Sequence, residues 1–579
     1  MAKRLQPFLI VTLLAWGLAL GSILALPLTP GALAHPGDHG ARYVAESGRD
    51  AGDCHALAHP CRTLEYALRQ AQKGDEVRVA AGAYFLTPDM GQSLLSSLVS
   101  VRGGYTVADG FTIQDPGSNP TYLMGITYLH RAELGEQGFI VLQDEKGWPG
   151  GDSVPAASQA QHPTPAAASR CENGQAAGYP CHGVDFLSRI SLDAFSSKPF
   201  DASDIWGFVD LNDNHEYALI GLRNGTAVVD VSAPGNPVEV GTILGQSAVW
   251  RDIKVYQFYD PPSAHWKAYA YVTADKVNQG LQIIDLTGLP ESVSLAATYN
   301  GIASAHNIYL SHVDYATGVT LTGQTAYAII AGANLDMGAF RILDLSNPLA
   351  PVEVTPPPLG AGYSHDVTTL LITDTRTSAC AKGHNPCEVL VDFNESTVEL
   401  WDITDKSAPF HLSSVAYSQS AYVHSGWWSK DRRFVFIQDE SDERSFGLNT
   451  TLRTLDITNL AAPNLSHIWS GPTPAIDHNG FVKGDRYYMA NYQRGLTILD
   501  IGNPNAPQEV AFFDTYPPAN LANYNGAWGV YPFLPSGTIL ISDIEGGLIL
   551  TRENPDGNGT WLPPDVTLNQ RVYLPLIWK

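Results

Sequence analysis

A short apolar strand that carries an aspartate near its end recurs from residue 226 onward. The clearest copy is Gly495–Ile501, and imperfect copies lie at Thr226–Val231, Leu281–Leu286, Phe340–Leu345, Val398–Ile403 and Leu452–Ile457. A degenerate last copy, Gly547–Thr551, lacks the aspartate. The aspartates are spaced by 55, 59, 58, 54 and 44 residues. Repeats of roughly 40 to 50 residues are typical of β-propeller blades, some of them lengthened by loop insertions.

Each copy lies within a fixed order of four short apolar runs that alternate with a period of two, and four strands make one blade. Seven such units between Ile205 and Arg552 predict an all-β, seven-bladed β-propeller. The seventh unit lacks a fourth strand. Either Val184–Leu192 or the C-terminal run Arg571–Ile577 is a candidate to close the ring and remove an exposed edge, and Pro575 makes the second a poorer inner strand.

The chain of 579 residues is too long for one core, so more than one domain is expected. We predict a signal peptide at 1–34, an N-terminal module at 35–145, a linker at 146–170, the propeller at 171–553 and a tail at 554–579. The net charge of −24 argues against binding to nucleic acid or to anionic membranes.

Lys3 and Arg4 precede the apolar run Phe8–Leu26, and Ala32–Ala34 offers a small-x-small cleavage site. This pattern indicates export, hence a secreted or surface-displayed protein without membrane insertion after cleavage; an uncleaved anchor is the alternative. Six cysteines fall into three close pairs, which in an exported chain predict disulfides, with zinc as the alternative. The pairs are Cys54/Cys61, Cys171/Cys181 and Cys380/Cys387.

In the N-terminal module, Asp53-Cys54, Pro60–Ala67 and Gly74–Tyr84 together resemble the opening turn of right-handed parallel β-helix, pectin-lyase-like proteins. The resemblance covers about a hundred residues and implies a short β-helix-like module. Because a solenoid needs several stacked coils to build a groove, we interpret the module as a cap, spacer or attachment unit.

The Leu-x-Ile-x-Asp-Ile strands with Asn-Pro-x-x-Pro turns, as at Ser346–Pro351 and Gly502–Pro507, resemble LVIVD repeats. The histidine-bearing segments Ala305–Asn307, Ser364–Asp366 and Asp477–Asn479 are similar to the choice-of-anchor B family. That resemblance implies a bacterial, exported protein displayed at the cell surface. We expect its partner to be an extracellular ligand or a cell-envelope component. We expect a monomer.

The first strand of each blade lines the central channel of a propeller. Alignment of the seven blades predicts that one level of this channel carries Trp206, Arg251, His306, His365, His424, His478 and Trp528. Neutral imidazole is a ligand for transition metals, so the four histidines are candidate metal ligands. Trp206, Arg251, Asp366, Trp528, Asp439 and Glu440 are candidate ligand-binding residues.

Two further interpretations stay open. The repeated histidines can serve only to lock neighbouring blades through hydrogen bonds. The run Asp439–Glu443 clusters oxygen ligands and is a candidate calcium site, or else a solvated acidic loop. The aspartate of the repeat has a structural interpretation, as an acceptor for backbone N–H groups of the following turn.

The sequence therefore predicts an exported binding or surface-interaction module that holds a divalent metal ion or a small polar ligand in its channel. A metal-dependent hydrolase or lyase that uses the same histidines and carboxylates is the alternative, and a purely structural envelope role is the third hypothesis.

Overall fold

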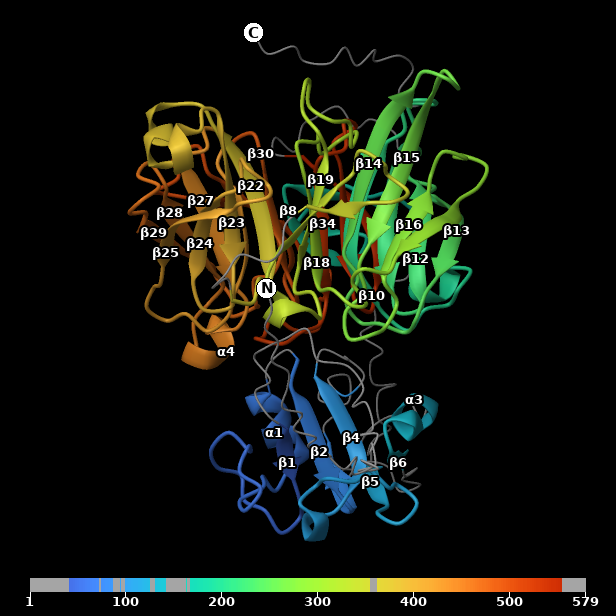
Figure 1. Cartoon of the computed structure of the whole chain (residues 1–579). Helices are drawn as coiled ribbons and strands as arrows, with labels where there is room; N and C mark the ends of the chain where they lie inside the picture. The colour runs from blue at the N-terminus through green and yellow to red at the C-terminus, as the bar shows by residue number, and fades with distance from the viewer. Residues whose placement is uncertain are drawn as a thin grey trace, which may run out of the picture.

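The computed structural model describes residues 41–71, 74–86, 94, 99–124, 131–141, 163, 167–354 and 362–554. The predicted signal peptide and the candidate closing strand Arg571–Ile577 lie outside these residues, as do most of the linker and tail. Seven antiparallel sheets are arranged around a common axis, and a smaller module lies against one face of the ring (Figure 1). The prediction of a seven-bladed propeller is confirmed.

From the axis outward, the first three blades contain β10 (Ala202–Val209), β11 (Glu216–Leu222), β12 (Gly225–Asp230) and β13 (Val238–Leu244); β14 (Ile253–Asp260), β15 (His265–Val272), β16 (Leu281–Asp285) and β17 (Ser294–Tyr299); and β18 (Asn307–Ser311), β19 (Tyr327–Ala331), β20 (Arg341–Asp344) and β21 (Val352–Glu353). Blades four and five contain β22 (Asp366–Ile372), β23 (Cys387–Phe393), β24 (Val398–Asp402) and β25 (Phe410–Val415); and β26 (Val423–Trp428), β27 (Phe434–Asp439), β28 (Thr451–Asp456) and β29 (Asn464–Ser470). Blades six and seven contain β30 (Gly480–Lys483), β31 (Arg486–Asn491), β32 (Gly495–Asp500) and β33 (Gln508–Phe513); and β34 (Ala527–Tyr531), β35 (Thr538–Asp543) and β36 (Gly547–Glu553).

The ring closes through β9 (Val184–Ile190), which pairs antiparallel with β36 as the outermost strand of blade seven. Of the two candidates that the sequence offered, the segment Val184–Leu192 therefore supplies the closing strand. On the inside, β34 contacts both β30 and β10, so the last blade packs against the first. Two further short strands, β7 (Gln175–Ala176) and β8 (Tyr179–His182), extend blade six outward from β33.

The repeated aspartate has the turn-forming role predicted for it. In all six copies one carboxylate oxygen accepts the backbone N–H of the residue two positions later, at 2.6–2.9 Å. The six residues are Asp230, Asp285, Asp344, Asp402, Asp456 and Asp500. The carboxylate therefore fixes the turn that leads from the third strand of a blade to its fourth.

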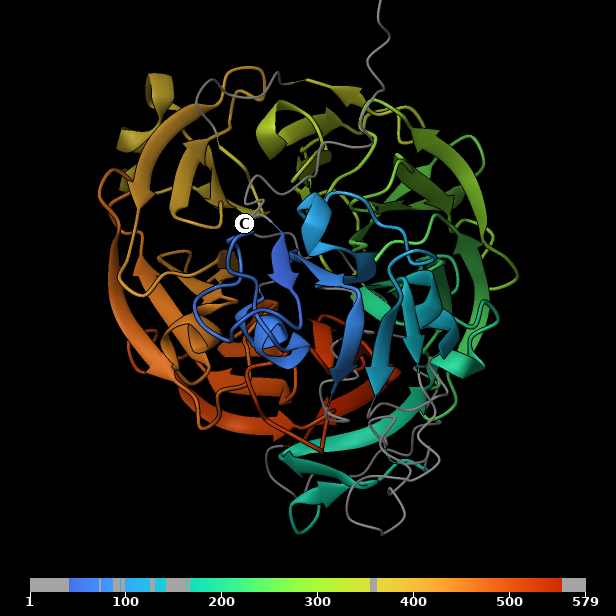
Figure 2. The ribbon, with the colours of Figure 1, turned by 90° about the horizontal axis from the view of Figure 1, so that it is seen from below.

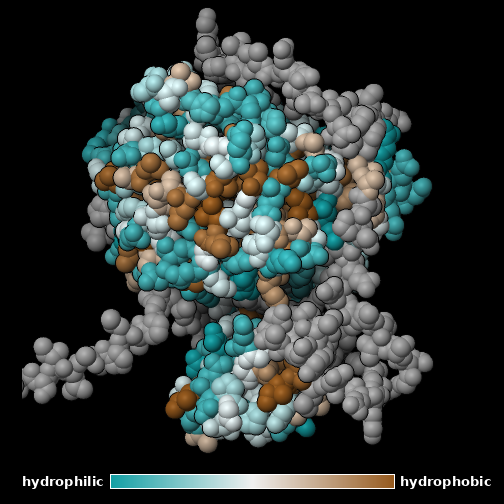
Figure 3. Space-filling model, turned by 90° about the vertical axis from the view of Figure 1, so that its right-hand side faces the viewer, coloured by the Kyte–Doolittle hydropathy of each residue, from teal (hydrophilic) through white to brown (hydrophobic). Residues whose placement is uncertain are grey.

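Most side chains of the fourth strands of blades one to six are exposed or only partly buried. Figure 3 shows apolar groups interspersed with polar ones around the side of the ring. Val238 and Leu244 at the two ends of β13 are 56% and 65% exposed, and Leu295 of β17 is 46% exposed. The second and third strands lie nearer the axis and are buried along nearly their whole length, as in β11, β12, β23 and β35.

The N-terminal module contains two parallel three-stranded sheets. One is formed by β1 (Arg42–Val44), β2 (Glu76–Ala80) and β4 (Ser100–Tyr105), the other by β3 (Gly82–Phe85), β5 (Thr121–Met124) and β6 (Phe139–Val141). Helices α1 (Leu64–Gln70) and α3 (Arg131–Glu136) complete it. Parallel sheets fit the expected β-helix-like module, and the resemblance to pectin-lyase-like proteins stays a prediction.

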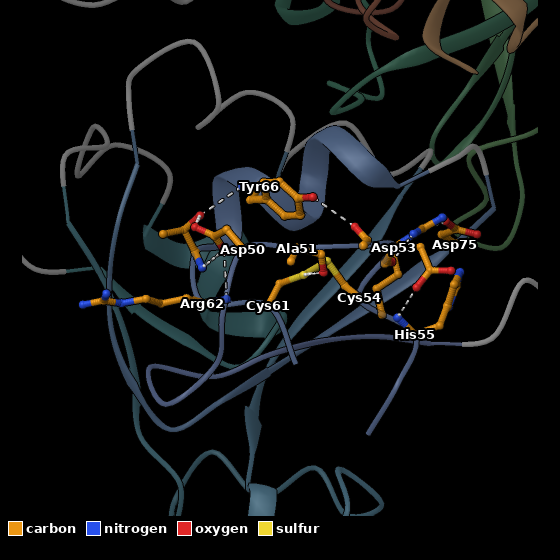
Figure 4. The surroundings of a disulfide bond; sticks show 12 residues. Asp50, Ala51, Asp53, Cys54, His55, Cys61, Arg62, Tyr66 and Asp75 are labelled. Atoms are coloured by element: carbon orange, nitrogen blue, oxygen red, sulfur yellow. Dashed lines mark hydrogen bonds and ion pairs between the residues drawn. A yellow bond between two sulfur atoms is a disulfide. The ribbon is translucent and has the colours of Figure 1, made fainter. Parts of the chain in front are cut away.

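The disulfide Cys54–Cys61 organises the loop between β1 and α1 (Figure 4). Asp50 accepts hydrogen bonds from the backbone N–H groups of Arg62 and Thr63, and Thr63 in turn caps the N-terminus of α1. The other two predicted disulfides, Cys171–Cys181 and Cys380–Cys387, are also formed. All three pairings are confirmed.

The module lies over the centre of the ring (Figure 2). Arg444, in the short helix α4 (Asp442–Phe446) that follows β27, donates to the carbonyl oxygens of Leu68 and Arg69 at 3.0 and 3.1 Å. These carbonyls belong to the last turn of α1, where a cation is favourable. Lys276 donates to the carbonyl oxygen of Gly74 at 3.4 Å. The module therefore contacts the face of the propeller on which α4 lies.

Among the described residues, no helix has the length and apolar character that would let it cross a membrane.

Candidate functional site

The four candidate histidines gather in an arc around the channel. His306 and His365 directly precede the inner strands β18 and β22, His424 lies in β26, and His478 comes two residues before β30. Successive imidazole centroids are 4.4, 4.3 and 4.4 Å apart. None of the four is more than 3% exposed. The repeat thus brings together residues that are up to 172 positions apart in the chain.

The Nδ1 atoms of three histidines are held by acceptors. His365 Nδ1 lies 2.8 Å from the carbonyl oxygen of His424, and His478 Nδ1 lies 2.5 Å from that of Trp528. His306 Nδ1 lies 3.0 Å from a carboxylate oxygen of Asp275. Because a carbonyl oxygen can only accept, Nδ1 of His365 and of His478 must carry the proton. In the neutral rings Nε2 then has the lone pair, which is the arrangement that metal-ligating histidines usually show.

A buried carboxylate faces two of these imidazoles. The two oxygens of Glu440 lie 3.6 Å from His424 Nε2 and 3.5 Å from His478 Nε2. The Tyr492 hydroxyl donates to Glu440 Oε1 at 2.6 Å and orients the carboxylate. Glu440 was predicted as a ligand-binding residue, and the structure places it within the histidine cluster.

The distances around Glu440 are compatible with ligation of a metal ion. At 3.5–3.6 Å the Nε2 and carboxylate oxygens are too far apart for a direct hydrogen bond. Metal bonds of about 2.1 Å at tetrahedral angles separate two ligand atoms by roughly 3.4 Å. One ligand atom from each of His424, Glu440 and His478 lies within 4.8 Å of the other two. The three side chains therefore fit a transition-metal ion.

Aromatic rings surround the arc. Trp528 lies edge-on to His478, with ring centroids 5.2 Å apart, and Tyr422 lies 5.1 Å from His365. Trp250, which the sequence analysis did not single out, lies 6.1 Å from His306. The space that His306, His424, His478 and Trp528 line has a volume of about 10 Å³. That is room for about one water molecule or one ion.

The expected position of Trp206 on the histidine level is wrong. Its ring packs against Tyr531 at 5.0 Å, Phe481 at 5.8 Å and Tyr315 at 6.4 Å. Together with Trp427 and Phe533, these rings fill the channel farther along the inner strands. Trp206 is the fifth residue of β10, whereas Trp528 is the second residue of β34, so the two tryptophans are not equivalent.

Arg251 lines the channel space but turns its guanidinium away from the histidines. Its Nε donates to the carbonyl oxygen of Leu222 at 2.9 Å, and Nη1 donates to Gln279 at 3.2 Å. Burial lowers the pKa of Arg251 to about 10. The residue therefore ties blade one to blade two.

Asp366 belongs to a second polar level, next to the histidines. Lys254 lies over the Trp206 ring, forms an ion pair with Asp252, and is 3.9 Å from a carboxylate oxygen of Asp204. Burial and the charge of Asp252 raise the pKa of Asp366 to about 7, and the same causes raise the pKa of Asp204 well above its ordinary value. Asp204 directly precedes Ile205, as Asp366 directly precedes Val367 in blade four, and the misplacement of Trp206 on the histidine level concealed this equivalence.

The Asp439 carboxylate has a structural role, because it is occupied by hydrogen bonds from the segment that precedes β26. Its carboxylate accepts the backbone N–H groups of Ala421 and Tyr422 and the Tyr417 hydroxyl, at 2.6–3.1 Å. Asp442, Glu443 and Asp477 form a separate buried acidic cluster, in which Arg453 binds Asp442 at 2.6 Å. Burial raises the pKa of Glu443 and Asp477 well above their ordinary values. The predicted calcium site at Asp439–Glu443 stays a prediction. The alternative of a solvated acidic loop is wrong, because every residue of this run is at most 3% exposed.

Comparison with known proteins supports the repeat. The model of the LVIVD repeat matches residues 214–244 and 481–515, which lie in blades one and six. A search of curated proteins finds no match.

Solved structures show weak likeness to the chain. A protein from Lactobacillus plantarum is 12% identical with a TM-score of 0.36, over 59% of this chain and 89% of that one. A functionally unknown protein from Desulfotomaculum acetoxidans is 9% identical with a TM-score of 0.34, over 52% and 82%. A hypothetical selenium-binding protein from Sulfolobus tokodaii is 11% identical with a TM-score of 0.38, over 61% and 91%.

Proposed function

We propose that this protein is an exported bacterial β-propeller that binds a transition-metal ion in its channel and acts as a binding module outside the cytoplasm. His424, His478 and Glu440 hold the ion, and His306 and His365 complete the arc beside them. The neutral Nε2 atoms and one carboxylate form a donor set that suits zinc, copper, iron or nickel.

The observation that carries this proposal is the pair of separations at Glu440. A carboxylate and an imidazole lone pair buried 3.5 Å apart repel each other unless a cation lies between them. A proton shared between the two groups would draw them to about 2.8 Å. A metal ion accounts for the longer separation, and the Tyr492 hydroxyl then serves as the outer hydrogen-bond donor that orients the carboxylate.

The small volume of the channel favours binding of the ion itself over catalysis inside the channel. A space of about 10 Å³ admits an ion but not an organic substrate. Export is supported by the N-terminal apolar run and by three disulfides, which persist in oxidising compartments. The choice-of-anchor B resemblance supports display at the cell surface.

The test is metal binding by the purified full-length protein after removal of bound metal with a chelator. We expect one equivalent of Zn²⁺ or Cu²⁺ to bind, and His424→Ala and Glu440→Gln each to reduce the affinity by at least about 100-fold. His411→Ala is the matched control, because His411 is half exposed on an outer strand and pairs with Glu399. Absence of stoichiometric metal, or equal loss in the control, would contradict the proposal.

A further inference from the structure

A buried acidic cluster lies where blade five meets blade six. Asp442 and Glu443 are the first two residues of α4, and Asp477 lies in the segment that leads to β30. One carboxylate oxygen from each of the three residues lies within 4.8 Å of the other two. None of the three residues is more than 3% exposed. The cluster therefore brings carboxylates from two neighbouring blades together, away from solvent.

The cluster is distinct from the proposed channel site. His478 Nε2 faces Glu440, whereas the preceding residue, Asp477, has a carboxylate oxygen close to Asp442 and Glu443 of α4. The acidic cluster offers only carboxylate oxygens, and the channel offers mainly imidazole nitrogens. Oxygen donors suit hard cations such as calcium, whereas imidazole suits transition metals.

The hydrogen bonds of the cluster leave one oxygen of each side chain without a donor. Asp477 Oδ2 accepts the backbone N–H of Asp439 at 3.2 Å, and Glu443 Oε1 accepts the backbone N–H of Asp477 at 3.4 Å. Asp442 Oδ2 lies 2.6 Å from a guanidinium nitrogen of Arg453. The remaining oxygens are buried and accept no hydrogen bond from the described residues: Asp442 Oδ1, Glu443 Oε2 and Asp477 Oδ1. Buried carboxylate oxygens without a donor are costly unless a cation binds them.

The positive charge beside the cluster does not balance it. The Arg453 guanidinium binds Asp442 and lies 4.7 Å from the centroid of the Tyr417 ring. It offsets one negative charge, and Glu443 and Asp477 retain two, which equals the charge of one divalent cation. A single proton shared between Glu443 and Asp477 would neutralise only one of the two. The charge count therefore favours a divalent cation.

Helix α4 is fixed in a position from which its acidic residues do not reach solvent. Arg444, which follows Glu443, donates to the carbonyl oxygens of Leu68 and Arg69 in the N-terminal module. Its guanidinium also lies 5.0 Å from the centroid of the Tyr524 ring. Rotating α4 to expose the carboxylates would break this contact between module and propeller, so the acidic residues stay buried together.

We propose that Asp442, Glu443 and Asp477 bind a calcium ion, which ties blade five to blade six on the face that the N-terminal module contacts. Calcium takes six to eight oxygen ligands, and a carboxylate can bind it through one or both oxygens. With calcium–oxygen bonds of about 2.3–2.6 Å, two ligand oxygens of one ion lie up to about 5 Å apart. The separations within the cluster fit this limit.

The test is calorimetric titration of Ca²⁺ into the full-length protein after removal of bound metal with a chelator. We expect one equivalent to bind with a Kd of about 1 mM or tighter. Glu443→Gln and Asp477→Asn should each weaken binding by at least about tenfold, because each loses a charged ligand. Asp485→Asn is the matched control, since the Asp485 side chain is 62% exposed and lies outside the cluster. Asp442 is left unchanged, because its loss would leave Arg453 buried without its ion pair.

Thermal unfolding separates a calcium site from a cluster that is only structural. Without Ca²⁺, Glu443→Gln should melt at or above the wild type, because the amide keeps the shape of the side chain and removes one crowded negative charge. At about ten times the Kd, Ca²⁺ should raise the Tm of the wild type by about 1–3 °C and that of Glu443→Gln by less than about 1 °C. If Asp477→Asn fails to fold, Glu443→Gln decides alone.

The proposal is overturned if no Ca²⁺ binds up to about 20 mM, or if Glu443→Gln binds Ca²⁺ as tightly as the wild type. Titration of Zn²⁺ into the same proteins keeps this result apart from the proposed function. Glu443→Gln should lose Ca²⁺ affinity and keep Zn²⁺ affinity, and His424→Ala should do the reverse. Binding of Ca²⁺ without Zn²⁺ would leave the acidic site standing and refute the channel site, and binding of Zn²⁺ alone would refute only the acidic site.

Discussion

His478 allows the metal-binding role of the histidines to be separated from a structural one. Its Nδ1–H donates to the carbonyl oxygen of Trp528, while its Nε2 faces Glu440. Asparagine can place an amide N–H where Nδ1 was but has no atom in place of Nε2. His478→Asn therefore keeps the hydrogen bond between blades and removes the metal ligand, whereas His478→Ala removes both.

The expected magnitudes follow from these contacts. In His478→Ala the buried Trp528 carbonyl loses its donor, which costs about 1–3 kcal/mol, and a cavity adds to this. His478→Asn avoids most of the first cost. At a metal concentration of about 100 times the wild-type Kd, binding stabilises the wild type by about 2.7 kcal/mol. A variant with about 100-fold weaker affinity gains only about 0.4 kcal/mol.

Thermal unfolding followed by tryptophan fluorescence measures both effects. Eight of the twelve tryptophans lie between residues 171 and 553, so the signal reports on the propeller. For a unit of this size, 1 kcal/mol corresponds to a shift of about 1–2 °C in Tm. Without metal, His478→Asn should melt close to the wild type and His478→Ala about 1–5 °C below His478→Asn. With metal, the wild type should gain about 3–5 °C and both variants less than about 1 °C.

The reasoning is refuted if His478→Asn gains as much from metal as the wild type, because Nε2 would then not be a ligand. If no metal raises the Tm of the wild type, the arc serves only to lock the blades. In that case the Tm of His478→Ala would still lie below that of His478→Asn, and added metal would change neither value.

Two further predictions concern the frame that holds the site. Burial raises the pKa of Asp514 to about 7, so the folded state holds its proton more tightly than the unfolded state; this contribution is fully present below about pH 4 and is lost as the pH rises through 7. Asp514→Asn should therefore raise the free energy of unfolding by up to about 4 kcal/mol at pH 8 and change it little at pH 4. The new amide can donate to Asn520 once the Asn520 side chain flips. Urea denaturation at the two pH values measures this difference, and equal effects at both would contradict the assignment. Phe186, on the closing strand, is 1% exposed and packs against Tyr179 and Phe513, so Phe186→Ala should cost about 3–5 kcal/mol in the same assay. A cost below about 1 kcal/mol would mean that β9 does not hold the ring closed.

The repeat made much of the fold predictable. The aspartate near the end of each third strand accepts the backbone N–H of the residue two positions later and so fixes a turn. Because this interaction joins near neighbours in the chain, the sequence alone predicts it. The closing strand was also predictable, since Val184–Leu192 alternates in the right place and a ring without it would expose an edge.

The histidines could be predicted because they repeat from blade to blade, whereas Trp206 was misplaced because its blade lacks the repeated residue. His306, His365 and His424 occupy matching positions in consecutive blades, so one alignment places all of them. The inner strand of blade one, β10, has no histidine to anchor that alignment. Trp206 was therefore assigned to the wrong residue of its strand and lies in the aromatic cluster.

The sequence by itself determined the number of blades, the turns between their strands, the disulfide pairs and the approach of four imidazoles to one axis, because each of these recurs or arises between near neighbours in the chain. Only the tertiary structure decided that Glu440 lies 3.5 Å from His478 Nε2, and that Asp477 joins Asp442 and Glu443 in one buried cluster. These residues come from different blades of the ring. Their distances depend on how whole sheets pack, and no repeat or local pattern encodes them.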